Sequence, residues 1–97
     1  MPRGCLRWDA RTDENESAII RDLKRVDISV QRLGRVGGGC PDLVLGYKGH
    51  TFLAEIKTDA GALSQKQLAW KAGWRGGEVI VAKDVDDIFK VLGIRGW

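Results

Sequence analysis

The amino-acid sequence predicts a small mixed α/β protein in which one β-sheet is flanked by helices. Residues 26–31 alternate apolar and polar side chains, which is the period of a half-buried strand. Ile19, Ile20 and Leu23 instead follow the spacing of one helix face. At 97 residues the chain can build one modest core but not two, so we expect a single domain over residues 1–97.

The expected elements follow the order αβββαβα. A first helix runs from about Asp13 to Arg25, with Thr12 or Asp13 as its cap, after an N-terminal arm over residues 1–11. Strands are expected at residues 26–31, 42–47, 51–57 and 78–82, and two further helices at residues 64–74 and 84–92. The run RLGRVGGG interrupts both periods and predicts a loop, and Gly93 ends the last helix.

The composition is ordinary for a globular protein, with 43% hydrophobic and 30% charged residues. No apolar run is long enough to cross a bilayer, and the first residues lack the apolar core of a signal peptide. We therefore expect a cytoplasmic protein with no membrane partner. Cys5 and Cys40 lie far apart and His50 is the single histidine, so we expect no zinc cluster and two reduced, structural cysteines.

The basic residues of the chain are grouped. A formal net charge of +3 and a pI near 9.1 are compatible with a nucleic-acid partner. We interpret a first cluster, Arg21, Lys24 and Arg25, as a solvated helix face. A second pair lies just before three glycines, and a flexible basic loop of this kind suits DNA phosphates. The predicted DNA contacts are Arg32, Arg35, Gly38, Gly39, Lys66 and Lys71.

The stretch CPDLVLGYKGHTFLAEIK predicts a hairpin that brings acidic side chains together. If Lys48 and Gly49 form a two-residue turn, Asp42 lies directly opposite Glu55. Their Cβ atoms would then be roughly 5 Å apart, on the same sheet face as Lys57. Two opposed carboxylates repel and one lysine offsets only one of them, so we expect a divalent cation here. The alternatives are an ordinary surface Glu/Lys pair and a longer loop that shifts the pairing.

The expected cation is Mg²⁺ or Mn²⁺. Carboxylate oxygens are the protein ligands that Mg²⁺ prefers, and this ion keeps several waters and accepts substrate phosphate oxygens. Such a site can activate a water for attack on a phosphate, while an adjacent lysine orients or deprotonates the nucleophile. The pattern therefore favours metal-dependent phosphodiester hydrolysis.

The dipeptide PD, followed by EIK, resembles the signature of the PD-(D/E)xK nuclease superfamily. The segments GGGCPD and FLAEIKTDAGALSQKQ, after a first-helix glutamate, are similar to its VRR-NUC family in the small stand-alone form carried by phages. The resemblance covers nearly the whole chain from about residue 13. It implies a restriction-endonuclease-like core and a metal-dependent DNA nuclease. Asp42, Glu55 and the backbone carbonyl of Ile56 would hold the metal, and Lys57 would position the water.

Two further positions carry over from the resemblance, and each has a second interpretation. Gln67 matches the glutamine of the family's LSxxQ pattern, which reaches toward the active site, but Ser64 and Gln67 also form the pattern of a helix capping box. Glu16 matches a metal-binding glutamate, although Asp13 and Glu16 also resemble a cap closure. Because Glu16 shares the apolar stripe of its helix, it needs a partner, and a metal ion is suitable. Cys40 departs from the family's usual small aliphatic residue without affecting the ligands.

We therefore predict a Mg²⁺- or Mn²⁺-dependent DNA endonuclease that acts on branched, Holliday-junction-type DNA. The predicted catalytic residues are Asp42, Glu55, Lys57 and Gln67, and the predicted metal ligands are Glu16, Asp42, Glu55 and Ile56. The alternatives are a non-catalytic DNA-binding module of the same fold, a structural or regulatory subunit, and a nicking or end-processing nuclease without junction preference. A pure binder gains nothing from carboxylates that face phosphate, which argues against the first two.

A homodimer is also expected, because a branched junction requires two symmetric incisions. Leu6, Trp8, Trp74 and Trp97 offer aromatic surface for a two-fold interface. The other interpretation is that these tryptophans complete a core that is short of large residues. A phage-encoded protein of this kind would act in the host cytoplasm.

Overall fold

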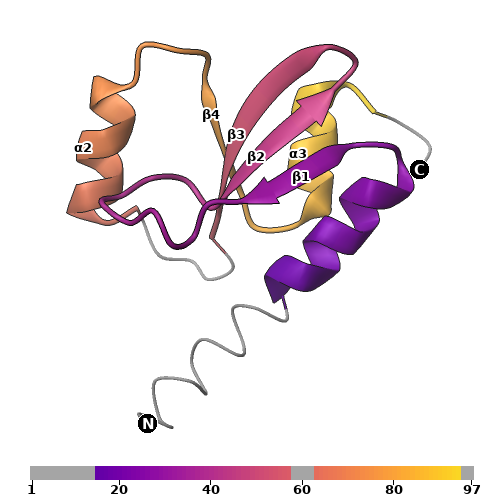
Figure 1. The fold of residues 1–97 in the computed structure, drawn as a ribbon, viewed down its shortest axis with the longest axis horizontal. Helices are drawn as coiled ribbons and strands as arrows, with labels where there is room; N and C mark the ends of the chain where they lie inside the picture. Colours follow the sequence, from indigo (N-terminus) through magenta and orange to yellow (C-terminus); the bar gives the residue numbers. More distant parts are fainter. Residues whose placement is uncertain (1–14, 58–62, 95–97) are drawn as a thin grey trace, which may run out of the picture.

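The computed structural model describes residues 15–57 and 63–94. These residues form a four-stranded sheet in the order β1-β2-β3-β4 (Figure 1). The strands are β1 (Ser29–Arg32), β2 (Leu43–Tyr47), β3 (His50–Ile56) and β4 (Val79–Ala82). The first three strands are antiparallel neighbours, whereas β4 runs parallel to β3, so the sheet is mixed. The prediction of a small mixed α/β protein is confirmed, while the predicted arm over residues 1–11 and the first helix cap lie outside the described residues.

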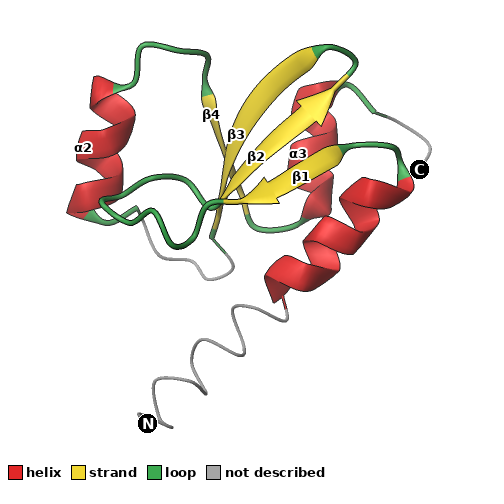
Figure 2. Ribbon diagram, viewed as in Figure 1, coloured by secondary structure: helices red, strands yellow, loops and turns green. Residues whose placement is uncertain are grey.

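In the part of the chain that the structure describes, three helices accompany the sheet (Figure 2). The first covers residues 15–25, and the others are α2 (Gln65–Gly73) and α3 (Val85–Leu92). Helix α3 begins at the cap Asp84, whose side chain accepts a hydrogen bond from the Asp87 N–H, and ends at Gly93 with φ 77°. No helix within residues 15–57 and 63–94 is long and apolar enough to span a membrane.

The hydrophobic core lies between one sheet face and two helices. The first helix contributes its apolar stripe, α3 contributes Val85, Ile88 and Phe89, and the sheet contributes the alternate residues of its three last strands. The buried core residues include Ile19, Ile20, Leu23, Ile28, Leu43, Leu45, Ala54, Ile56, Ile80 and Ala82. In contrast, α2 has no buried residue and stands apart from this core (Figure 2). The opposite sheet face carries polar residues such as Glu55 together with apolar ones such as Leu53 and Val81.

The first strand starts later than the sequence suggests. The predicted strand over residues 26–31 is wrong at its beginning, because the chain first makes a turn at Asp27, where φ is 67°. The Ile28 N–H donates to the Leu23 carbonyl at 3.2 Å, which closes the end of the first helix. Ile28 is therefore buried as part of this closure rather than as a strand residue, and β1 begins only at Ser29.

Candidate functional site

The hairpin of β2 and β3 has the register predicted from the sequence. Lys48 and Gly49 both have positive φ, 49° and 82°, which is the requirement of a two-residue type I′ turn. From this turn the two strands pair in step as far as Leu43 and Ala54. The alternative of a longer loop that shifts the pairing is therefore wrong.

Asp42 and Glu55 meet one position beyond the last pair of this ladder. The Asp42 Oδ2 atom accepts a hydrogen bond from the backbone N–H of Ile56 at 2.8 Å. The Asp42 carboxyl is also hydrogen-bonded to the Glu55 carboxyl. The predicted strand included Asp42, but β2 begins one residue later, at Leu43. The Ile56 N–H therefore bonds to the Asp42 side chain instead of to a backbone carbonyl of β2. The two acids are thus fixed to the backbone of the central strands.

Glu55 is a buried acid with an altered proton affinity. The residue is 5% exposed. Burial, followed by the hydrogen bond and the negative charge of Asp42, raises the pKa of Glu55 to about 8. The charge of Glu16 acts in the same direction and the ammonium of Lys57 acts against it. At neutral pH Glu55 therefore keeps its proton.

Lys57 and Ile56 are placed by the parallel pairing of β3 with β4. The Lys57 N–H donates to the Ala82 carbonyl at 2.7 Å, one residue past the end of β3. The Lys57 side chain is close enough to Glu55 to lower its pKa, so the predicted lysine does belong to the acid pair. The Ile56 side chain is 9% exposed and lies in the core. Ile56 can therefore contribute to a site only through its backbone groups.

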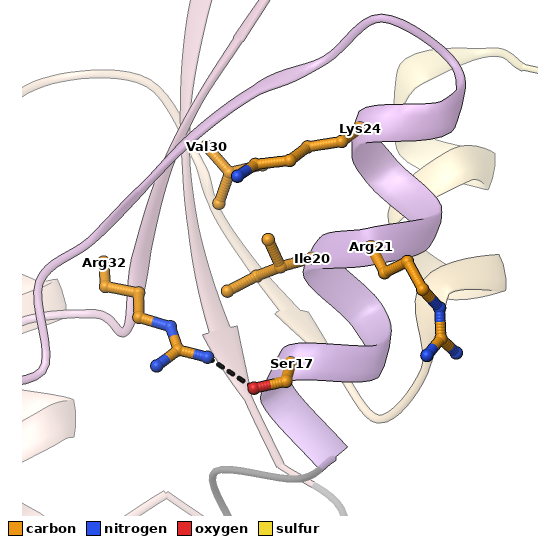
Figure 3. Close-up of a pocket in the computed structure, with 6 residues that line it drawn as sticks. All are labelled: Ser17, Ile20, Arg21, Lys24, Val30 and Arg32. Atoms are coloured by element: carbon orange, nitrogen blue, oxygen red, sulfur yellow. Dashed lines mark hydrogen bonds between the residues drawn. The ribbon is translucent and has the colours of Figure 1, made fainter.

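Glu16 is brought close to the acid pair, but with a partner that the sequence did not reveal. It is 8% exposed on the first helix, at the end of the predicted apolar stripe. Its Oε1 atom is 3.3 Å from the Nε of Arg32, and the Nη2 of Arg32 donates to the Ser17 Oγ at 2.7 Å (Figure 3). The sequence predicts a metal ligand at Glu16 and a DNA contact at Arg32, whereas the structure joins the two residues in one ion pair.

A cavity of about 450 Å³ opens beside this ion pair, between the first helix and β1. It is lined by Ser17, Ile20, Arg21, Lys24, Val30 and Arg32. Lys24 extends from the helix across the opening toward Val30, whereas the guanidinium of Arg21 is directed away from β1 (Figure 3). The side chains of Arg21 and Arg25 are 63% and 73% exposed, as expected of a solvated helix face. Lys24 instead belongs to the cavity.

Gln67 closes a capping box at the start of α2. The Ser64 Oγ accepts from the Gln67 N–H at 3.2 Å, and the Ser64 N–H donates to the Gln67 Oε1 at 2.8 Å. The capping interpretation is thus confirmed. Gln67 also lines a narrow cavity of about 10 Å³ together with Glu55 and Lys71, which is room for a single water. Because Gln67 also lines a cavity with Glu55, its role at the active site stays a prediction.

The glycine-rich loop, residues 34–39, packs against the first turn of α2. Gly37, Gly38 and Gly39 all have positive φ, and the Cys40 N–H donates to the Gly37 carbonyl at 3.2 Å. A Cβ atom on Gly39 would lie 2.2 Å from the Lys66 carbonyl oxygen, whereas a Cβ on Gly38 would meet nothing within 4 Å. Where the sequence analysis expects a flexible loop, the structure shows hydrogen-bonded turns that touch the first turn of α2.

Of the remaining predicted DNA contacts, Lys71 lines a narrow cavity together with Glu55. Arg35, Lys66 and Lys71 are exposed, on the glycine-rich loop and on α2. Trp70 of α2 stacks on Trp74, the residue that caps the end of this helix, with ring centroids 4.9 Å apart and an interplanar angle of 18°. Trp74 is 43% exposed, so the interpretation of this tryptophan as a core residue is wrong. Leu6, Trp8 and Trp97 lie outside the described residues.

Cys40 belongs to the site, which the sequence analysis missed. It is a free cysteine, partly buried, two residues before Asp42. Burial, and then the charges of Glu55 and Asp42, raise the pKa of the Cys40 thiol. The available signal was its position directly before the PD dipeptide. Cys5 lies outside the described residues.

The donor set of the acid pair fits a hard divalent cation. Within the described ranges, no three His, Cys, Asp or Glu side chains are arranged as a metal-holding group, and Glu16 is engaged with Arg32. Mg²⁺ and Mn²⁺ are often held by only one or two protein carboxylates, which Asp42 and Glu55 provide. A cation bound here would compensate the negative charge that otherwise raises the pKa of Glu55.

A search of protein-family models, curated proteins and solved structures finds no match to this chain.

Proposed function

We propose that the protein is a Mg²⁺- or Mn²⁺-dependent DNA endonuclease that hydrolyses phosphodiester bonds. The observation that carries the proposal is the pair of carboxyl groups formed by the buried Glu55 and the partly buried Asp42, with a lysine next to it. Opposed acids destabilise a fold unless a proton or a cation compensates their charge, and acids with perturbed pKa values cluster at functional sites. The restriction-endonuclease-like core and the VRR-NUC resemblance belong to this proposal.

Each residue of the pair has a defined role in the proposal. Asp42 and Glu55 would hold the cation, together with the carbonyl of Ile56. When bound, the cation would supply a more acidic water and compensate charge on the phosphate under attack. The Ile56 N–H fixes one oxygen of Asp42, which leaves the carboxylate a single orientation. Lys57, held at the end of β3, would position the attacking water and stabilise the negative charge that develops.

The other predicted residues support these groups. Glu16 would act as a ligand only after release from Arg32, so we assign it chiefly to the electrostatic environment of the acid pair. Gln67 would orient the substrate or the water from the cap of α2. Arg35, Lys66 and Lys71 would contact DNA phosphates, and Gly39 would let the loop approach α2 closely.

The test is cleavage of flaps, forks, four-way junctions and linear duplex, with and without Mg²⁺. EDTA should abolish cleavage and Mn²⁺ should restore it. Asp42→Asn and Glu55→Gln should remain folded and lose cleavage, whereas the exposed acid Glu78→Gln should cleave like the wild type. Wild-type rates in either variant of the acid pair would remove the site assignment.

A homodimer with preference for branched DNA is part of the proposal. Two sites related by a two-fold axis would allow symmetric incisions across a junction. The half-exposed Trp74 and the exposed Val81 give apolar surface on the side of the sheet where the acid pair lies. Sedimentation at micromolar concentration tests this directly. A monomer that cuts linear and branched DNA equally would leave a nicking or end-processing nuclease.

A further inference from the structure

The cavity between the first helix and β1 is unusual in its charge and its shape. Its lining contains Arg21, Lys24 and Arg32 and no acidic residue. Between the two ends that Lys24 and Arg32 occupy, the floor is apolar, formed by Ile20 and Val30 (Figure 3). The occupant that complements this lining is anionic at its ends and apolar between them.

Lys24 and Arg32 approach the cavity from different elements. Ser17 and Lys24 are seven residues apart on one helix, a separation of about 10 Å along its axis. Arg32 enters from β1 and is held at the Ser17 end by its hydrogen bond and by Glu16. Lys24 has no ion-pair partner among those found in the described residues, so its charge is available to a ligand.

The size of the cavity limits the occupant. At about 450 Å³ it has the volume of a small-molecule site, in the usual range of about 300–1,000 Å³. One or two nucleotides of an unpaired strand fit such a volume, with phosphates near Lys24 and Arg32 and a sugar or base on the apolar floor. A double helix, which has to be read from outside through its grooves, does not enter it.

The Arg32 end of the cavity lies beside the candidate site, because Arg32 pairs with Leu43, the residue that follows Asp42. Arg32 lines the cavity and is bonded to Glu16, whose charge acts on Glu55. A strand that leaves the acid pair therefore meets the Arg32 end of the cavity first. We propose that this cavity holds an unpaired DNA strand adjoining the bond to be cut, so that the substrate class is DNA with a single-stranded segment. This inference rests on the proposed nuclease function.

The experiment is binding of a fluorescent ten-nucleotide thymidine strand to the full chain in EDTA, in competition with blunt duplex of equal length. Wild-type protein should prefer the single strand. Lys24→Gln should lose roughly three- to tenfold in affinity, and the slope of log affinity against log salt should fall by about 0.7, the share of one single-strand phosphate contact. Arg25→Gln removes the same charge from the next residue of the helix, which does not line the cavity, and should change neither quantity by as much.

A second variant tests shape without changing charge. Val30→Trp fills the cavity and should reduce strand binding, whereas Val91→Trp, on the exposed surface of α3, should not. Circular dichroism shows whether each variant is folded, and methyl chemical shifts of Ile20 should move when the thymidine strand is added to wild type. Equal effects of Lys24→Gln and Arg25→Gln, or unchanged Ile20 shifts, would overturn the inference.

The outcomes also separate this inference from the nuclease proposal. If single-strand binding depends on Lys24 but no cleavage occurs in Mg²⁺ or Mn²⁺, the nuclease proposal is rejected. The cavity would then bind a single strand, but not as part of a cleavage substrate. Cleavage that is equal on blunt and overhanging DNA, and unaffected by Lys24→Gln, would keep the nuclease and reject the cavity as a strand site. Preferred binding of blunt duplex would also reject it.

Discussion

The stability of the metal-free protein should fall as the pH rises, because Glu55 is protonated in the folded state. The pKa of Glu55 is about 8 in the fold, against 4.5 for an ordinary glutamate. Between these two values the folded state holds a proton that the unfolded chain has released. The stabilising contribution is therefore complete below about pH 4.5 and is lost as the pH rises toward 8.

The size of the effect follows from the width of this window. Each pH unit inside it changes the free energy of unfolding by up to about 1.4 kcal/mol. From about pH 5 to about pH 7.5 the loss is therefore about 3 kcal/mol. For a domain of this size that corresponds to a decrease of roughly 10–20 °C in melting temperature. It is also a large share of the total stability of a small domain.

The assay is urea unfolding followed by circular dichroism in EDTA across this pH range. Glu55→Gln keeps a hydrogen-bond donor but cannot ionise, so its stability should be nearly independent of pH between 5 and 7.5. Glu78→Gln and His50→Gln are exposed controls, and each should retain most of the wild-type slope. Saturating Mg²⁺ should reverse the trend for the wild type, since the cation binds the deprotonated pair. A wild-type slope that persists in Glu55→Gln would refute the reasoning.

Three further outcomes follow from the geometry. Lys57→Ala should bind metal and DNA but cleave slowly in single-turnover assays, and an unchanged rate would reduce this lysine to an ion-pair partner. Gly39→Ala should lower the free energy of unfolding in urea by about 2–4 kcal/mol, because the new Cβ meets the backbone of α2. Gly38→Ala should lower it by only about 1 kcal/mol, since a Cβ there meets nothing. Equal losses would contradict the close approach of Gly39 to α2. Arg35→Ala should weaken DNA binding without changing the free energy of unfolding. Arg32→Ala should also lower the free energy of unfolding by about 1 kcal/mol, because it removes the ion pair with Glu16 and the hydrogen bond to Ser17. Identical unfolding curves of the two variants would contradict this.

The acid pair could be predicted from the sequence because its geometry is local. Alternation along a hairpin, together with a turn of known length, fixes which side chains face each other, and Asp42 and Glu55 follow from counting. The caps Ser64 and Asp84 are local for the same reason. Gly93 likewise acts within a single turn of the chain.

The features that the sequence did not reveal depend on contacts between distant segments. The ion pair of Glu16 with Arg32 joins two residues sixteen positions apart on different elements, and no periodicity marks it. The close packing of Gly39 on Lys66 involves backbone atoms, which leave no side-chain pattern to read. The late start of β1 results from a left-handed Asp27, a conformation that the apolar alternation around it concealed.

The type I′ turn between β2 and β3 also has a consequence for how the site assembles. Asp42 and Glu55 are separated by a short continuous hairpin, whose formation takes on the order of microseconds. The parallel pairing of β3 with β4 must instead wait until the chain has returned through α2, which closes a longer loop. The two acids would therefore be neighbours early in folding, before the rest of the sheet shields them from water. A cation in the medium could then bind the nascent hairpin and guide the later steps, so that refolding should accelerate with added Mg²⁺.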